Sequence, residues 1–144
     1  MRKILCLLLF FMSSFAYPYC FDEAEKIYNV NKELLIAIAK VESNMRPDAI
    51  NWNRNGTFDY GVMQINSAWY YELGEEKWHK LADPCENVKT GAMILSKCIK
   101  KYGFNWKAVD CYNKGSKASD FSSYVLKVYK KLVASPKNKK GIDQ

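Results

Sequence analysis

Apolar residues recur three and four positions apart along most of this chain, and that spacing predicts amphipathic helices. The most apolar stretch follows Asn31, a residue type that caps helix starts, and it includes Leu35 and Ile38. The same period places Glu42 on this apolar stripe, at the end of a helix that must stop before Pro47. Other helices are expected over residues 22–28, 86–102, 106–112 and 119–133 and from Ser67 onward, with a helical turn over 75–81.

The ends and faces of these helices can also be predicted. Asp22 and Glu25 have the spacing of a capping box, which would open the first helix. Gly103 is typical of a helix C-terminus, and Asn105 can cap the helix that follows it. The residues expected to pack inward are Phe21, Ala24, Ile27 and Tyr28 in the first helix and Phe121, Tyr124, Val125, Val128 and Leu132 in the last.

The stretch over residues 50–60 is the only credible β segment. It contains Asn55-Gly56, a strong hairpin signal, but it is short and polar, so a hairpin of two or three strands is expected. The following segment, residues 61–66, reads as a loop with Met63 and Ile65 in the core. Gln64 and Asn66 alternate with them and would point the other way. The pattern therefore predicts a mainly α, single-domain protein with a small β-hairpin.

The length of 144 residues suits one domain with a substantial core. Residues 1–16 combine Arg2 and Lys3 with a short apolar run and a small-residue end, which predicts a cleaved secretory signal. No other segment approaches the length of a membrane span. We expect a folded domain over residues 17–135 and a disordered basic tail over 136–144, in an exported protein.

Cysteine content and charge narrow the chemistry. Four cysteines remain after the signal, an even number that favours disulfides in an exported domain, with three possible connectivities. His79 is the only histidine, so no metal site is expected. Without the signal the formal charge falls from +7 to +5, with 20 basic and 15 acidic side chains. This excess suits an anionic wall polymer, a nucleic acid or a membrane surface, and export argues against nucleic acid.

Two carboxylates are candidates for catalysis. Glu42 lies on an apolar stripe, where an acid is costly unless it is used, and Asp59 follows 17 residues later in the hairpin. Across a cleft, the two would form the carboxylate pair of a sugar-cleaving enzyme. The competing interpretation is an isolated, solvated glutamate and an ordinary turn aspartate.

Sequence motifs favour the catalytic interpretation. Glu42-Ser43 followed by the Gly61–Asn66 segment GVMQIN, together with CYNKG from Cys111 and the later Tyr124-Val125-x-x-Val128, resembles the lytic transglycosylases, lysozyme-like enzymes that cut peptidoglycan. The resemblance covers nearly all of the chain after residue 19. It points to the small, single-domain, secretion-system-associated branch of that family. A lysozyme-like α+β fold with the hairpin beside an active-site cleft is implied.

The resemblance also implies roles for individual residues. Glu42 would be the catalytic acid, and Asp59 is a departure, because most relatives lack a carboxylate there. The Tyr124 hydroxyl would approach the acid. The other implied substrate-binding residues are Ser43, Gln64, Asn66, Tyr112 and Asn113. The implied disulfides are Cys20–Cys85 and Cys98–Cys111, and no cofactor is implied.

The expected function is cleavage of the β-1,4 bond between N-acetylmuramic acid and N-acetylglucosamine, with a 1,6-anhydro product. Hydrolysis that uses both Glu42 and Asp59, as in a muramidase, is an alternative, and a non-catalytic glycan-binding scaffold is another. A periplasmic monomer is expected. The resemblance suggests that the enzyme opens the cell wall locally for a secretion system or pilus. A rod, needle or pilus component would recruit it.

Overall fold

The computed structural model describes residues 19–135, so the predicted signal (1–16) and tail (136–144) lie outside the described residues. Within this range the chain forms six α-helices, two short 3₁₀ helices and three strands, which confirms the mainly α fold with a small antiparallel sheet. The elements are α1 (Phe21–Tyr28), α2 (Lys32–Glu42), β1 (Ile50–Trp52), β2 (Phe58–Tyr60), β3 (Ile65–Asn66), η1 (Ser67–Trp69), α3 (Tyr70–Lys80), α4 (Pro84–Tyr102), α5 (Trp106–Lys114), η2 (Gly115–Lys117) and α6 (Ser123–Val133).

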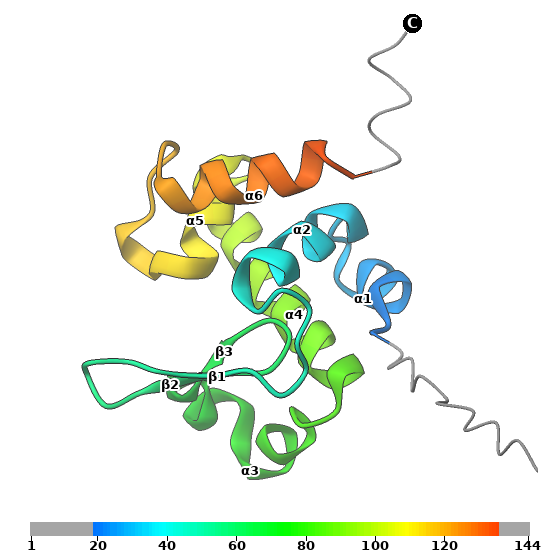
Figure 1. Cartoon of the computed structure of the whole chain (residues 1–144), viewed down its shortest axis with the longest axis vertical. Helices are drawn as coiled ribbons and strands as arrows, with labels where there is room; N and C mark the ends of the chain where they lie inside the picture. Colours follow the sequence, from blue (N-terminus) through cyan, green and yellow to red (C-terminus); the bar gives the residue numbers. More distant parts are fainter. Residues whose placement is uncertain (1–18, 136–144) are drawn as a thin grey trace, which may run out of the picture.

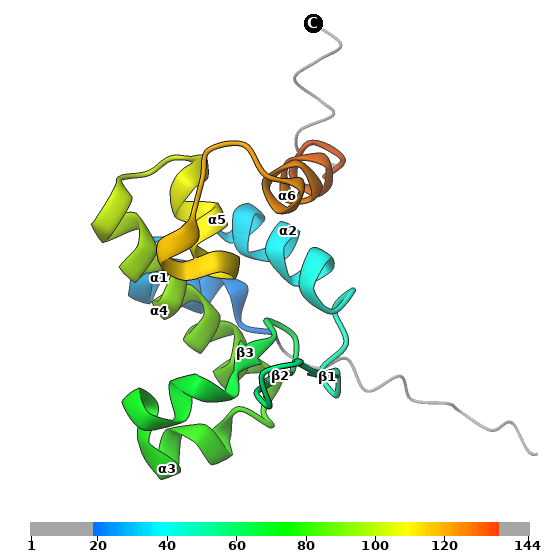
Figure 2. The same ribbon diagram turned by 90° about the vertical axis from the view of Figure 1, so that its left-hand side faces the viewer.

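The long helix α4 runs through the middle of the molecule, with α1 and α5 packed along it and α2 packed against α6 (Figure 1). The sheet and α3 lie together at one end, and α6 lies at the other, in both views (Figure 2). The core is built from fully buried aliphatic side chains of several helices. They include Leu35 and Ile38 of α2, Val88 and Leu95 of α4 and Val128 of α6. No helix in the described part of the chain has the length and hydrophobicity to cross a bilayer.

Helix α2 follows its local signals closely. The Asn31 side chain caps it by accepting a 3.0 Å hydrogen bond from the Leu34 N–H, as predicted. Leu35 and Ile38 are fully buried, and Glu42 is the last helical residue, only partly accessible. The apolar stripe therefore carries the carboxyl group to the edge of the core.

The predicted capping box of the first helix is wrong. Cys20 precedes α1 in a left-handed conformation without any side-chain cap, and Glu25 instead accepts a hydrogen bond from the Lys32 N–H at the start of α2. Ile27 was expected to pack inward but is 55 % exposed. The short α1 buries only Phe21 and Ala24 against its neighbours.

Three other helix limits differ from the prediction. Helix α6 begins at Ser123 rather than residue 119, because the Ser122 side chain accepts from the Val125 N–H, and Phe121 is left 96 % exposed. Helix α4 begins two residues early, since Asp83 caps it and a proline suits the first turn. Helix α5 continues past Tyr112 to Lys114.

The sheet has the order β1-β2-β3, and β3 lies in the segment that was predicted to be a loop. Met63 and Ile65 are fully buried, as expected. The register pairs Asp59 with Asn51 on one side and with Asn66 on the other. Because side chains alternate across a strand, these three polar residues share one face of the sheet.

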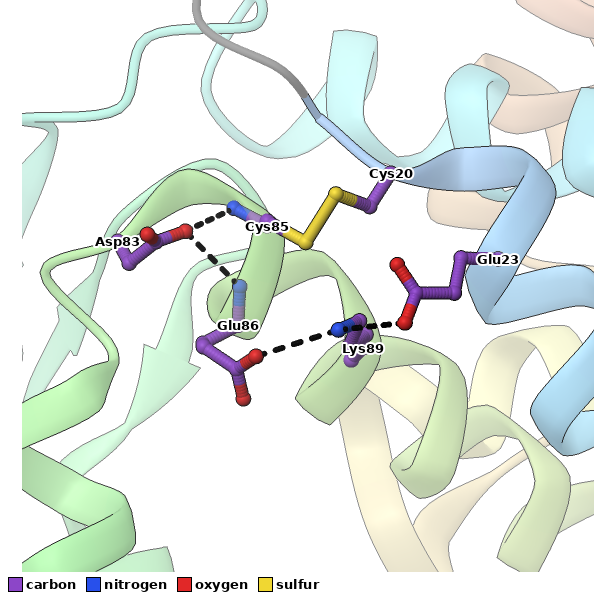
Figure 3. The surroundings of a disulfide bond; sticks show 6 residues. All are labelled: Cys20, Glu23, Asp83, Cys85, Glu86 and Lys89. Carbon is purple, nitrogen blue, oxygen red and sulfur yellow. Dashed lines mark hydrogen bonds and ion pairs between the residues drawn. A yellow bond between two sulfur atoms is a disulfide. The ribbon is translucent and has the colours of Figure 1, made fainter.

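Two disulfides join helices, in the same pairs that the family resemblance implies. Cys20–Cys85 links the start of α1 to α4, and Cys98–Cys111 links α4 to α5. Beside the first bridge, the Lys89 ammonium contacts Glu23 at 2.9 Å and Glu86 at 3.2 Å (Figure 3). The bridge and these ion pairs together hold the N-terminal helix on the central one.

Candidate active site

A cleft of about 760 Å³ opens between the sheet and the helices α4 and α5. Six of the eight residues that the sequence predicts for the site line it: Glu42, Asp59, Gln64, Asn66, Tyr112 and Asn113. These residues come from α2, from β2, from β3 and the turn before it, and from α5, which are far apart in the chain. The fold therefore brings the separate motifs to one cavity.

The Glu42 side chain is largely buried by protein atoms, and it also lines the cleft. The Tyr124 hydroxyl, 82 residues away in the chain, donates a 2.6 Å hydrogen bond to its Oε1. Burial raises the pKa of Glu42 to about 7; the Tyr124 hydrogen bond opposes this rise, and the negative charge of Asp59 adds to it. A substantial fraction of the Glu42 carboxyl groups is therefore protonated near neutral pH, and a general acid needs such a protonated form.

Tyr124 packs its ring into the core and directs its hydroxyl at Glu42. The residue is buried on α6, and burial raises its pKa far above the ordinary tyrosine value, with the Glu42 charge adding to the effect. The phenol therefore stays protonated and acts as a hydrogen-bond donor. Tyr124 does not line the cleft, and its contact with the site is the hydrogen bond to Glu42.

We expect Tyr124→Phe to lower the rate of glycan cleavage roughly tenfold, because one hydrogen bond to a charged group is lost. That bond favours ionised Glu42, so its loss raises the Glu42 pKa and moves the basic limb of the pH–rate profile to higher pH. The control is Tyr129→Phe on the same helix, whose ring packs on Trp106. A basic limb that stays in place in Tyr124→Phe would contradict the assignment.

Asp59 is held from both sides by amide groups. Asn66 donates to its Oδ1 at 2.7 Å and Asn53 donates to its Oδ2 at 3.0 Å. Since both oxygens are engaged, the side chain is fixed in one orientation toward the cleft. Asn53 also lines the cleft and was not predicted from the sequence, although the Asn-rich hairpin was a visible signal.

Gln64 and Asn66 line the cleft but are already engaged by the protein. Gln64 is buried at a positive φ of 50°, donates to the carbonyls of Ala49 and Gly61 and accepts from Asn51. Asn66 caps η1 by accepting from the Ala68 N–H. Both amides therefore shape the wall of the cleft before any ligand arrives.

Ser43 and Tyr112 fasten the GVMQIN segment in place. Ser43 does not line the cleft; its hydroxyl donates to the Val62 carbonyl at 2.7 Å. The Tyr112 hydroxyl donates to the Met63 carbonyl at 2.6 Å, and burial raises the Tyr112 pKa well above its ordinary value. Asn113, next to it on α5, is exposed on the cleft wall.

A buried asparagine that sequence reasoning missed completes this support. Asn87 of α4 is fully buried, accepts from the Met63 N–H at 2.8 Å and donates to the carbonyls of Tyr60 and Leu81. A Cβ at Gly61 would lie 2.2 Å from the Asn87 amide nitrogen, so only glycine fits there. An asparagine among the apolar positions of a helix was the available signal.

Asp110 is a second buried polar residue, and it positions α6. Its carboxylate accepts from the Ser122 hydroxyl and the Ser119 N–H and pairs with Lys114 at 3.3 Å. Burial alone would raise the Asp110 pKa, but these contacts outweigh it and lower the pKa. Because Ser122 caps α6, this network sets where the Tyr124 helix begins.

The described residues contain one group of potential metal ligands, Cys20, Glu23 and Cys85. Two of the three are sulfurs of a disulfide bond, which do not ligate metal as thiolates.

A glutamic acid at the end of an apolar helix, in an open cleft lined by amides and a second carboxylate, is an arrangement typical of lysozyme-like glycan-cleaving enzymes. A family model, the transglycosylase SLT domain, matches residues 19–131, and the chain belongs to this family. It is a lytic transglycosylase, and the family's substrate is peptidoglycan.

Individual relatives match over most of their length. The chain is 44% identical to "Invasion protein IagB" of Salmonella typhi over 137 residues, which cover 87% of this chain and 86% of that protein. It is 34% identical to "Protein IpgF" of Shigella flexneri, with 92% and 91% covered. It is 37% identical to "X polypeptide" of Escherichia coli, with 85% and 77% covered.

Proposed function

We propose that this enzyme cleaves the β-1,4 bond between N-acetylmuramic acid and N-acetylglucosamine and closes a 1,6-anhydro ring on the muramyl unit. The observation that carries the proposal is the state of Glu42, whose pKa of about 7 lets one group give and then take a proton. Glu42 lines the cleft, so the glycan oxygen can reach it.

Each step uses the same carboxyl group. Protonated Glu42 donates to the glycosidic oxygen, the bond to the muramyl C1 breaks, and N-acetylglucosamine leaves with the proton. The carbonyl oxygen of the muramyl N-acetyl group stabilises the cation at C1. The ionised Glu42 then accepts the proton of the 6-hydroxyl as its oxygen bonds to C1. No water is consumed, and the enzyme returns to its starting state.

Asp59 provides a negative charge beside the reaction centre, and it orients the N-acetyl group or stabilises the cation in our proposal. Because glycan-hydrolysing enzymes use a pair of carboxyl groups, the presence of Asp59 also favours hydrolysis as a second candidate function. In that reaction a water molecule takes the place of the 6-hydroxyl. Mass spectrometry of fragments from purified sacculi separates the two outcomes. Anhydro ends weigh one water less than reducing ends, so a digest that contains only reducing ends would overturn transglycosylation.

We expect Asp59→Asn to retain cleavage but to lower its rate about tenfold, because one stabilising charge near the cation is lost. Removing that charge also lowers the pKa of Glu42, so the basic limb of the pH–rate profile moves to lower pH. The rate is measured by release of soluble fragments. Asp48→Asn, which is exposed and outside the cleft, is the control. A rate equal to that of the wild type would contradict a role for Asp59.

The four remaining predicted residues that line the cleft are assigned to substrate binding. Tyr112 and Asn113 form one wall of the cleft, and Gln64 and Asn66 form the other with the sheet. We assign Ser43 a supporting role, because its contacts run to the backbone of the GVMQIN segment.

The proposed setting is the periplasm, where the enzyme opens the wall locally for a secretion system or pilus. Support comes from the predicted signal over residues 1–16 and from a relative described as an invasion protein. We propose that it acts as a monomer without a cofactor, recruited by a rod, needle or pilus component. Recovery of the mature protein in an osmotic-shock fraction tests the location, and retention in the cytosol would overturn it.

A further inference from the structure

Two lysines that the proposed chemistry does not use line one end of the cleft, where α4 meets α5, and a third lysine lies next to them just outside the lining. Lys97 and Lys101 stand one turn apart on α4, and both line the cleft. Lys107 of α5 joins them around the Tyr102 ring: the ammonium groups of Lys101 and Lys107 lie 5.1 and 5.2 Å from its centroid. We call Lys97, Lys101 and Lys107 the lysine edge.

The charges of the lysine edge are only partly balanced. Lys97 pairs with Glu72 and lies 5.3 Å from the Trp69 ring centroid. Lys101 and Lys107 form no ion pair with any residue from 19 to 135, although both approach the same aromatic ring. Two neighbouring like charges repel, so an anion at this position would be attracted by both.

The other charged side chains of the cleft do little to neutralise the lysine edge. Arg54 of the hairpin adds another positive charge to the lining, against the carboxyl groups of Glu42 and Asp59. Both carboxyl groups are occupied within the site, by Tyr124 and by the two asparagines. A polymer that enters this cleft therefore meets a basic edge as well as the two carboxyl groups.

Peptidoglycan carries anions at a defined place relative to that bond. Each muramyl unit bears a lactyl group, and a peptide stem attached there adds several carboxylates farther from the sugar. The stem is joined to the lactyl carboxyl group as an amide, so removal of the stem frees the lactyl carboxylate and takes away the carboxylates of the stem. Stem-bearing strands therefore offer the larger and more distant negative charge.

We propose that the lysine edge binds carboxylates of the peptide stem, so that the enzyme prefers stem-bearing glycan to glycan without stems. This inference rests on the proposed function of the cleft. Lys101 and Lys107 are specificity-determining residues in this account, and Lys97 supports them while it pairs with Glu72.

The test compares uncrosslinked stem-bearing strands with the same strands after an amidase has removed the stems. Binding is measured by calorimetry in a Glu42→Gln background, so that the readout does not depend on cleavage. The test variant adds Lys101→Gln and Lys107→Gln. The matched control adds Lys127→Gln and Lys131→Gln, two exposed lysines four residues apart on α6. Initial cleavage rates and KM are measured in the same pairs with Glu42 intact.

We expect stem-bearing strands to bind about fivefold more tightly than stripped strands, as two exposed ion pairs would give. This ratio should fall toward one in the lysine-edge variant, mainly through KM, and persist in the control. A wild-type ratio of one, a ratio unchanged by the substitutions or an equal loss in the control would overturn the inference. Weaker binding of both glycans by the same factor would assign the lysines to a part of the glycan that both share, and it would overturn the inference too. Cleavage without anhydro ends would count against the proposed function alone, because the binding ratio is measured independently.

Discussion

Glu42→Gln is expected to lower the rate of sacculus cleavage about 10³-fold at neutral pH, since glutamine can neither donate nor accept the transferred proton. The glutamine keeps the shape of the side chain and can still accept from Tyr124. Release of soluble fragments is the measurement. Glu33→Gln, at the other end of α2 and outside the cleft, is the control that should retain activity. Wild-type activity in Glu42→Gln would remove the central assignment.

The same substitution has a second expected effect, on stability. The pKa of Glu42 rises from 4.5 to about 7 on folding. Between pH 4.5 and pH 7 the native state therefore binds a proton at Glu42 that the unfolded state has released. Wild-type stability therefore loses this contribution as pH rises from 4.5 through 7, whereas Glu42→Gln does not titrate. We expect the variant to gain roughly 2–3 kcal/mol relative to wild type between pH 4 and pH 8. Urea unfolding at the two pH values measures the difference, and a pH-independent difference would contradict the buried acid.

The second large effect is expected from removing Cys20–Cys85 by a double substitution to alanine. This bridge closes a loop with a sequence separation of 65 residues, against 13 for Cys98–Cys111. In the chain-entropy account the longer loop contributes about 4 kcal/mol and the shorter about 3 kcal/mol. The free energy of unfolding of a small domain is only about 5–15 kcal/mol, so a loss of about 4 kcal/mol is a large part of it. The Cys20→Ala/Cys85→Ala variant should therefore unfold far below the wild-type temperature.

The shorter bridge should matter more for activity than for stability. Cys98 and Cys111 both line the cleft, and Cys111 directly precedes Tyr112, which holds the Met63 carbonyl. Thermal unfolding ranks the two double variants by stability, and fragment release at a temperature where both are folded ranks them by activity. Opposite rankings are expected. A Cys98→Ala/Cys111→Ala variant with full activity would show that the bridge does not position the cleft wall.

Local patterns predicted what depends on neighbours in the chain. The Asn31 cap, the buried stripe of Leu35 and Ile38 and the Asn55-Gly56 hairpin are decided within a few residues, where period and turn chemistry dominate. The capping box failed although its spacing was right, because Glu25 found a partner at the start of the next helix. The prediction that Phe121 packs inward was wrong, because the Ser122 cap starts α6 later than the apolar period suggested.

The site residues predicted from the sequence fall into two groups in the structure. Glu42, Asp59, Tyr112 and Asn113 line the cleft, whereas Ser43 serves the backbone behind it. Asn87 and Asp110 were not predicted, because a polar residue on an apolar helix face has no visible partner in the sequence. Their partners, the Met63 N–H and the Ser122 hydroxyl, lie 24 and 12 residues away.

The order of the helices, the position of the hairpin and the placement of an acid at the end of an apolar helix were determined by the sequence alone, since each depends on short-range spacing. What that acid can do was decided only by the tertiary structure. Burial beneath neighbouring elements raises the Glu42 pKa to about 7, and Tyr124 and Asp59 adjust it from opposite directions. Electrostatic energies depend on distance and exclusion of water, and folding sets both.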